Sequence, residues 1–105
     1  MIRLGIVSTK GGSGKSTLTT HLAAWAEAQG IATGVIDCDP QGSAALWHRL
    51  REAETPRLAQ RTPGQIARFD ALGVDLLLVD SAPAHSADVQ TIATACDFIL
   101  IPTRP

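Results

Sequence analysis

The stretch Lys10-Gly11-Gly12-Ser13-Gly14-Lys15-Ser16 decides the fold class of this chain. It follows a short, mostly apolar run from Ile2 to Val7, which we interpret as a buried parallel strand. It opens a helix that we predict over Lys15 to Gln29. A loop that wraps a triphosphate turns its backbone N–H groups inward, and residues without a Cβ allow that close approach. The glycines therefore predict a phosphate-binding loop, whereas a glycine-rich turn that binds nothing would not require this strand-to-helix context.

The end of this loop carries the groups that would hold a nucleotide. Lys15 can reach the β- and γ-phosphates, and the Ser16 hydroxyl is placed to ligate Mg²⁺. The usual pattern has glycine where this chain has Thr9, and Lys10 directly precedes the double glycine. The candidate nucleotide-binding residues are Gly11, Gly12, Ser13, Gly14, Lys15, Ser16 and Thr17.

The rest of the chain alternates between predicted strands and helices. Strands are predicted over Thr33 to Cys38, Val74 to Val79 and Phe98 to Ile101, helices over Ser43 to Glu52 and Asp88 to Cys96, and a loop with one irregular helix near Gln65–Leu72 over Glu54 to Ala71. This alternation predicts one α/β domain with a parallel sheet and helices on both faces. The polar residues at the ends of the first three strands, Lys10, Asp39 and Asp80, should gather at one edge of the sheet.

Composition sets limits on partners and location. The formal net charge is −1, from 9 Lys and Arg against 10 Asp and Glu, so no overall charge draws the chain to nucleic acid or an anionic membrane. No apolar stretch approaches the ~20 residues of a membrane span, and no signal peptide is recognised. Cys38 and Cys96 lack metal-ligand or disulfide spacing and are expected to be reduced core thiols. We therefore expect a cytoplasmic protein with no membrane partner.

Several other side chains have open roles. The arginines of the middle region could contact DNA phosphates or form a solvated face; they are Arg49, Arg51, Arg57, Arg61 and Arg68. His21 and His85 have no other metal-ligating residues at suitable spacing in the sequence and are interpreted as structural or exposed. Trp25 is expected in the core, and Trp47 in the core or on a dimer surface.

Two aspartate motifs follow later strands. Asp37-Cys38-Asp39-Pro40-Gln41-Gly42-Ser43 comes after the second strand, and Leu76-Leu77-Leu78-Val79-Asp80 is an apolar strand that ends in a carboxylate. Mg²⁺ keeps several waters and takes few carboxylates, so one such residue near a phosphate loop is adequate. Asp37 has two interpretations: a functional carboxylate, or one that holds the loop by local hydrogen bonds.

Together these motifs resemble the deviant Walker A ATPases of the ParA/MinD group. The Lys10–Ser16 loop is similar to their Walker A loop, and Leu76–Asp80 is similar to Walker B. The box from Asp37 to Ser43 resembles the ParA form D-x-D-P-Q, which favours ParA-like proteins over MinD-like ones. Ser81-Ala82-Pro83 and the closing run Ile99–Pro105 resemble later motifs of the family, so the resemblance covers nearly the whole chain.

The resemblance implies a P-loop NTPase that binds and hydrolyses Mg-ATP and dimerises on ATP in plasmid or chromosome partitioning. It implies catalytic roles for Lys10, which would reach the partner's phosphates, for Lys15, and for Asp39, which would orient the attacking water. The implied metal-site residues are Ser16, Asp39 and Asp80. The implied partners are ATP, a second copy of the chain, a ParB-like adaptor and nonspecific DNA.

Family members are roughly double this length, so we expect residues 1–105 to be the N-terminal part of a ParA-like domain. The other half carries much of the adenine pocket and the DNA-holding residues, so the DNA surface is expected to be missing and hydrolysis is left open. The alternatives are a truncated, non-hydrolysing nucleotide-binding or ParA-interacting protein and a small-molecule kinase. The strand near Ile101 should form an exposed sheet edge.

Overall fold

The structure of the chain is a computed structural model. It describes residues 1–7, 15–39, 42–52, 55–62, 64–65, 74–81 and 86–102, without the side chains of residues 15, 16, 43 and 86–89. The phosphate-loop segment 8–14 lies outside these ranges.

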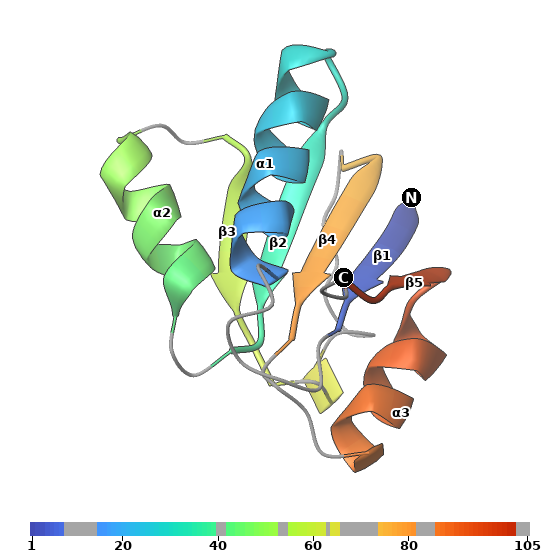
Figure 1. Ribbon diagram of the computed structural model, residues 1–105. Coiled ribbons are helices and arrows are strands. Elements are labelled where there is room, and N and C mark those ends of the chain that lie inside the picture. The colour runs from blue at the N-terminus through green and yellow to red at the C-terminus, as the bar shows by residue number, and fades with distance from the viewer. Residues whose placement is uncertain are drawn as a thin grey trace.

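Among the described residues, five parallel strands form one sheet in the order β3-β2-β4-β1-β5 (Figure 1). The strands are β1 (Ile2–Ile6), β2 (Thr33–Asp37), β3 (Arg57–Gln60), β4 (Leu76–Asp80) and β5 (Phe98–Leu100), and the helices are α1 (Lys15–Ala28), α2 (Ser43–Arg51) and α3 (Ser86–Ala95). The α/β class, the parallel sheet and the position of the last strand at an edge are confirmed.

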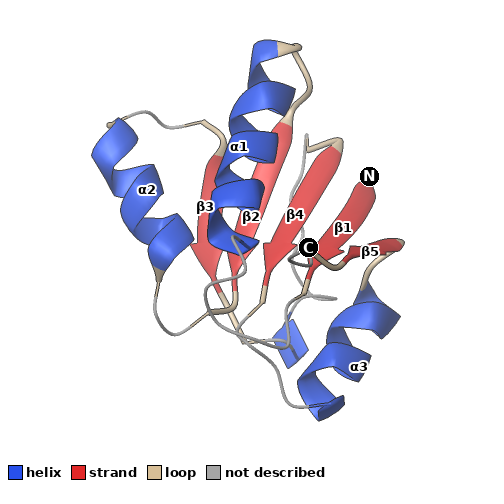
Figure 2. Ribbon diagram, viewed as in Figure 1, coloured by secondary structure: helices blue, strands red, loops and turns tan. Residues whose placement is uncertain are grey.

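Helices cover both faces of this sheet (Figure 2). On one face, Ala23 of α1 and Ala44 of α2 pack with Ile6, Val35 and Leu78. On the other face, Ile92 of α3 packs with side chains of three strands and the residues that follow them; these include Val7, Ile36, Cys38, Leu77 and Val79. Strands that are buried on both faces read as continuous apolar runs, which is why β2 and β4 were recognisable in the sequence.

The fifth strand corrects the prediction for the middle region. Residues 57–60 were expected to be loop, but they pair with Gly34 to Asp37 of β2 as the edge strand β3. An edge strand contacts a neighbour on one side only, so its side chains can stay partly exposed, and Arg57 and Gln60 are exposed. The predicted helix near Gln65–Leu72 lies mostly outside the described residues.

Trp25 is a second correction. It was expected in the core, yet its side chain is 57% exposed. The buried stripe of α1 consists of small residues spaced three or four apart, Thr19, Ala23 and Ala26. Trp25 directly precedes the buried Ala26, so its side chain is rotated about 100° around the helix from Ala26 and turned away from the sheet. Trp47, by contrast, is half-buried against the α1 face of the core and carries the Arg51 guanidinium 4.9 Å from its ring centroid.

The structure also gives the burial of the other side chains whose roles the sequence left undecided. Cys38 and Cys96 are free thiols, the first buried and the second half-buried. His21, Arg49, Arg51, Arg57 and Arg61 are exposed, and His85 and Arg68 lie outside the described residues. None of the described helices is both long and apolar enough to cross a membrane.

Candidate functional site

The carboxyl ends of β2 and β4 lie side by side at one edge of the sheet. Asp37 and Asp80 are Cα partners in the parallel register, and the Cys38 N–H donates to the Asp80 carbonyl at 2.8 Å. Asp39 follows two residues after Asp37 and is 8% exposed, while Asp80 is fully buried. The structure therefore brings Asp39 and Asp80 to the same edge, as their positions after parallel strands predict.

The end of β1 is tied to the same edge from both sides. The Ser81 hydroxyl and N–H both donate to the Ile6 carbonyl, at 2.9 and 3.2 Å. On the other side, the Val7 N–H donates to the Leu100 carbonyl at 3.0 Å. The end of β1 thus lies next to the end of β4, and the next described residue along the chain is Lys15, where α1 begins.

Asp37 is a structural carboxylate with two backbone partners. Its Oδ1 accepts the Asp39 N–H at 2.9 Å, and its Oδ2 accepts the Ala45 N–H at 3.0 Å. Ala45 lies in the first turn of α2, whose N-cap is Gly42 and has no side chain to satisfy that donor. Asp37 therefore caps α2 from the neighbouring strand, and its negative charge lies at the positive end of the helix. The hydrogen-bonding interpretation of Asp37 is the one that the structure supports.

The predicted site residues divide by what the structure describes. Lys10, Gly11, Gly12, Ser13 and Gly14 lie outside the described residues. Lys15 and Ser16 are placed by their backbone at the start of α1, and Thr17 is exposed in the same turn. The roles assigned to these residues stay predictions.

The chemistry of the edge fits Mg²⁺. In the described part of the chain, no three His, Cys, Asp or Glu side chains lie together as a metal-binding group. Asp39 and Asp80 instead offer two carboxylates on adjacent strands, and a Mg²⁺ site takes its other oxygens from water, a hydroxyl and phosphates. Asp39, Asp80 and Ser16 would hold such an ion.

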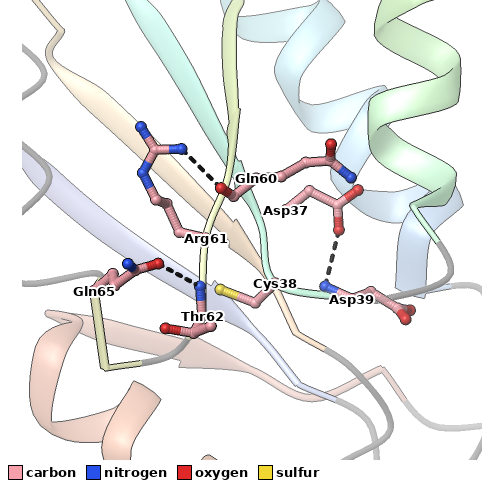
Figure 3. A pocket seen from close by; sticks show the side chains of 7 residues that line it. All are labelled: Asp37, Cys38, Asp39, Gln60, Arg61, Thr62 and Gln65. Atoms are coloured by element: carbon pink, nitrogen blue, oxygen red, sulfur yellow. Dashed lines mark hydrogen bonds between the residues drawn. The ribbon is translucent and has the colours of Figure 1, made fainter.

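Beside this edge lies a hollow of about 300 Å³ at the ends of β2 and β3 (Figure 3). Its walls come from Asp37, Cys38, Asp39, Gln60, Arg61, Thr62 and Gln65. The Arg61 Nη1 donates to the Gln60 carbonyl at 2.7 Å, and the Gln65 Oε1 accepts the Thr62 N–H at 3.0 Å. Sequence reasoning did not place Gln60, Arg61, Thr62 and Gln65 at this edge, because β3 was not recognised as a strand and its carboxyl end was therefore not recognised either.

Comparison with known proteins decides the family. The model of the CobQ/CobB/MinD/ParA nucleotide binding domain matches residues 4–102. The chain belongs to this family. The match to the CobQ/CobB/MinD/ParA family extends over nearly the whole chain, as the resemblance of its motifs predicted.

Curated relatives of this family member carry two kinds of name. "Maintenance of carboxysome distribution protein A" of Gloeobacter kilaueensis is 35% identical over 106 residues, which are 97% of this chain and 49% of the relative. The protein of the same name from Halothiobacillus neapolitanus is 31% identical over 109 residues, 97% and 50% of the two chains. "Protein ParA" of Rhizobium radiobacter is 30% identical over 106 residues, 95% and 47%. The chain spans about half the length of these relatives.

Solved structures also match nearly all of this chain over about half of their own length. A nucleotide-binding protein from Archaeoglobus fulgidus in complex with ADP has a TM-score of 0.72 and 25% identity, over 99% of this chain and 54% of that one. The structure of pnob8 ParA also has a TM-score of 0.72, at 19% identity, over 96% and 51%. The fold is therefore that of a ParA-type nucleotide-binding domain, with about half of its neighbours' length.

Proposed function

We propose that the chain binds Mg-ATP at the carboxyl edge of its sheet and hydrolyses it as a ParA-like ATPase. The observation that carries the proposal is that Asp39, just after β2, and Asp80, at the end of β4, lie at the edge of the sheet where β1 also ends. The ADP complex of the Archaeoglobus fulgidus neighbour supports a nucleotide as ligand.

Each residue has a proposed task in this reaction. Lys15 and the backbone of Gly11 to Gly14 bind the phosphates, and the start of α1 adds its partial positive charge. Asp39 orients the attacking water, and Asp80 and Ser16 hold Mg²⁺. The metal, when bound, neutralises charge on the transferred phosphoryl group. Because phosphoryl transfer needs little covalent help, positioning by these groups is the contribution that matters.

A second copy of the chain completes the proposed cycle. Dimerisation on ATP would let Lys10 of one copy reach the phosphates of the other and add a cation where charge develops. The name "Protein ParA" of the Rhizobium radiobacter relative agrees with the resemblance from which we propose a role in plasmid or chromosome partitioning, with a ParB-like adaptor and DNA as partners. The carboxysome-related names support positioning of a cargo by the same cycle.

The test is nucleotide affinity and turnover with and without Lys15. ATP binding by calorimetry in the presence of Mg²⁺ should weaken by about 10- to 100-fold in Lys15→Ala, the loss of a charge-assisted contact. Arg49→Ala removes an exposed cation on α2 and should change nothing. Binding or phosphate release that is equal in wild type and Lys15→Ala would rule out this site.

A second function is favoured by the chain's half-length match to its relatives. A nucleotide-binding protein without turnover, or one that pairs with a full-length ParA, would keep the phosphate edge and lack the rest. Measuring affinity and hydrolysis on the same sample separates the two, because binding without phosphate release supports this alternative.

A further inference from the structure

A second hollow, of about 390 Å³, lies at the amino edge of the sheet, opposite the edge that holds Asp39 and Asp80. The strands β2 and β3 begin at this edge, where α1 ends (Figure 1). The hollow is lined by Glu27 in the last turn of α1, by residues 30–33 before and at the start of β2, and by Thr55, Arg57 and Val74. Its volume is near the lower end of the range for small-molecule pockets, so it suits a ligand smaller than a nucleotide.

The charged side chains of this hollow are one carboxylate and one guanidinium. Among the described residues, neither Glu27 nor Arg57 has an ion pair or a side-chain hydrogen bond, and the two do not pair with each other. The last turn of α1 contains no basic residue, so Glu27 adds its charge to the negative end of that helix. The end of α1 therefore favours a cationic group of a ligand, while Arg57 offers a guanidinium to an anionic one.

The two charges belong to opposite faces of the sheet. Glu27 lies on α1, which packs on one face. Arg57 is the Cα partner of Gly34, and paired residues point to the same face. A Cβ added at Gly34 would lie 3.3 Å from Leu77 Cδ1, a side chain of the core cluster on the α3 face. The hollow thus extends around the start of β2 from one face to the other, and a ligand that meets both charges has to be elongated.

Uncharged groups line the part of the hollow between these charges. Val74 is buried, and Ile31 and Ala32 are half-buried. The Thr33 hydroxyl donates to the Ile31 carbonyl at 2.8 Å, so its hydrogen is already used. At Gly30 an added Cβ would meet nothing within 4 Å, which leaves open space beside the turn. This lining suits methylene groups between the two charged ends of a ligand.

We propose that this hollow is a binding site for a small aliphatic zwitterion, with an ammonium at one end and a carboxylate at the other. The ammonium pairs with Glu27 and lies at the end of α1, and the carboxylate pairs with Arg57. The site is separate from the edge proposed to bind nucleotide, because the two lie at opposite ends of the strands.

The test measures amide NMR spectra of the chain while three ω-amino carboxylates of increasing length are added: β-alanine, γ-aminobutyrate and ε-aminocaproate. No nucleotide is present, so the result does not depend on the proposed ATPase activity. The signals of residues 30–33, Thr55 and Arg57 should shift and saturate with at least one of them, at a dissociation constant of about 1 mM, as expected for so small a ligand. The monocarboxylate and the primary amine of the same chain length each lack one charge and should bind at least about tenfold more weakly.

Neutral variants test the two charged side chains. Glu27→Gln and Arg57→Gln should each weaken binding at least about tenfold, through the loss of one charge-assisted contact. Glu52→Gln and Arg49→Gln are the matched controls, because both residues are exposed and neither lines the hollow, and they should bind like wild type. The same spectra show whether each variant is folded, and the singly charged ligands test the claim on wild type alone.

Three results would each overturn the proposal. The first is that none of the three zwitterions shifts these signals at concentrations up to about 20 mM, well above the expected dissociation constant. The second is that the singly charged ligands bind as tightly as the zwitterion of the same length. The third is that the four variants, all folded, bind alike.

Discussion

The carboxylate of Asp37 holds the backbone of Asp39, through a hydrogen bond of 2.9 Å from the Asp39 N–H to Oδ1. Its other oxygen holds Ala45 in the first turn of α2. One buried side chain thus fixes both the residue proposed to orient water and the helix that follows it. Asp37 acts as a positioning residue for the carboxyl end of β2.

Replacing Asp37 should therefore affect stability and the site together. Asp37→Ala leaves two N–H donors without their partner, and we expect a loss of about 2–4 kcal/mol in the free energy of unfolding, measured by urea denaturation. Asp75→Ala is the control, since Asp75 is exposed, and it should change stability by less than about 0.5 kcal/mol. Equal effects of the two substitutions would contradict the positioning role.

Asp80 should control how strongly Mg²⁺ promotes nucleotide binding. In wild type, Mg²⁺ should tighten ATP binding; in Asp80→Asn, a neutral side chain of the same shape, the affinity for the metal should fall by about 10- to 100-fold. Titrations of ATP at fixed Mg²⁺ concentrations give this dependence directly. An unchanged dependence in Asp80→Asn would place the metal elsewhere.

Gly5 should tolerate no side chain. A Cβ on Gly5 would lie 2.7 Å from Ile99 Cδ1, 3.0 Å from Ile92 Cγ2 and 3.2 Å from Cys96 Sγ. Gly5→Ala should destabilise the fold by about 1–3 kcal/mol, because α3 or β5 has to shift. At Gly64 an added Cβ meets nothing within 4 Å, so Gly64→Ala should be close to neutral. Thermal unfolding of both variants checks this contrast.

Cys96 should make stability depend on alkaline pH. Burial raises the pKa of its thiol from 9.0 to about 11, while Arg3 lowers it less and Asp97 adds a small increase. The unfolded chain therefore loses this proton at lower pH than the folded one. The stability from the neutral thiol is fully present below pH 9 and is lost as the pH rises to about 11. Urea unfolding across this range should show a decline in wild type that is smaller in Cys96→Ala.

The edge that holds Asp39 and Asp80 was predictable because strand ends are encoded locally. The apolar runs before Asp37 and Asp80 mark buried parallel strands, and all carboxyl ends of a parallel sheet meet at one edge. The start of α1 at Lys15, directly after the glycines in the sequence, was predictable from the same local signals. No knowledge of the strand order was needed for this result.

The edge strand β3 could not be predicted, because its four residues contain only one large apolar side chain, Leu58, and begin and end with polar residues. What makes Arg57–Gln60 a strand is the ladder with β2, a contact between distant segments. The exposure of Trp25 has a similar cause. Spacing alone permits it on the sheet side, but the close approach of α1 to β2 and β4 selects the small residues Ala23 and Ala26 instead.

The strand order also determines when the molecule can fold. The first strand pairs Ile2 with Leu76 and Leu4 with Phe98, so it lies between β4 and β5, which come after all the other described strands in the sequence. A growing polypeptide can form α1, β2 and α2 early, but β1 has no neighbour until residues 76–80 of β4 have left the ribosome, and its second neighbour β5 comes later still. Closing such long loops precedes any gain from pairing, which slows folding. Until then the apolar side chains of β1 are open to capture by a chaperone or by another nascent chain.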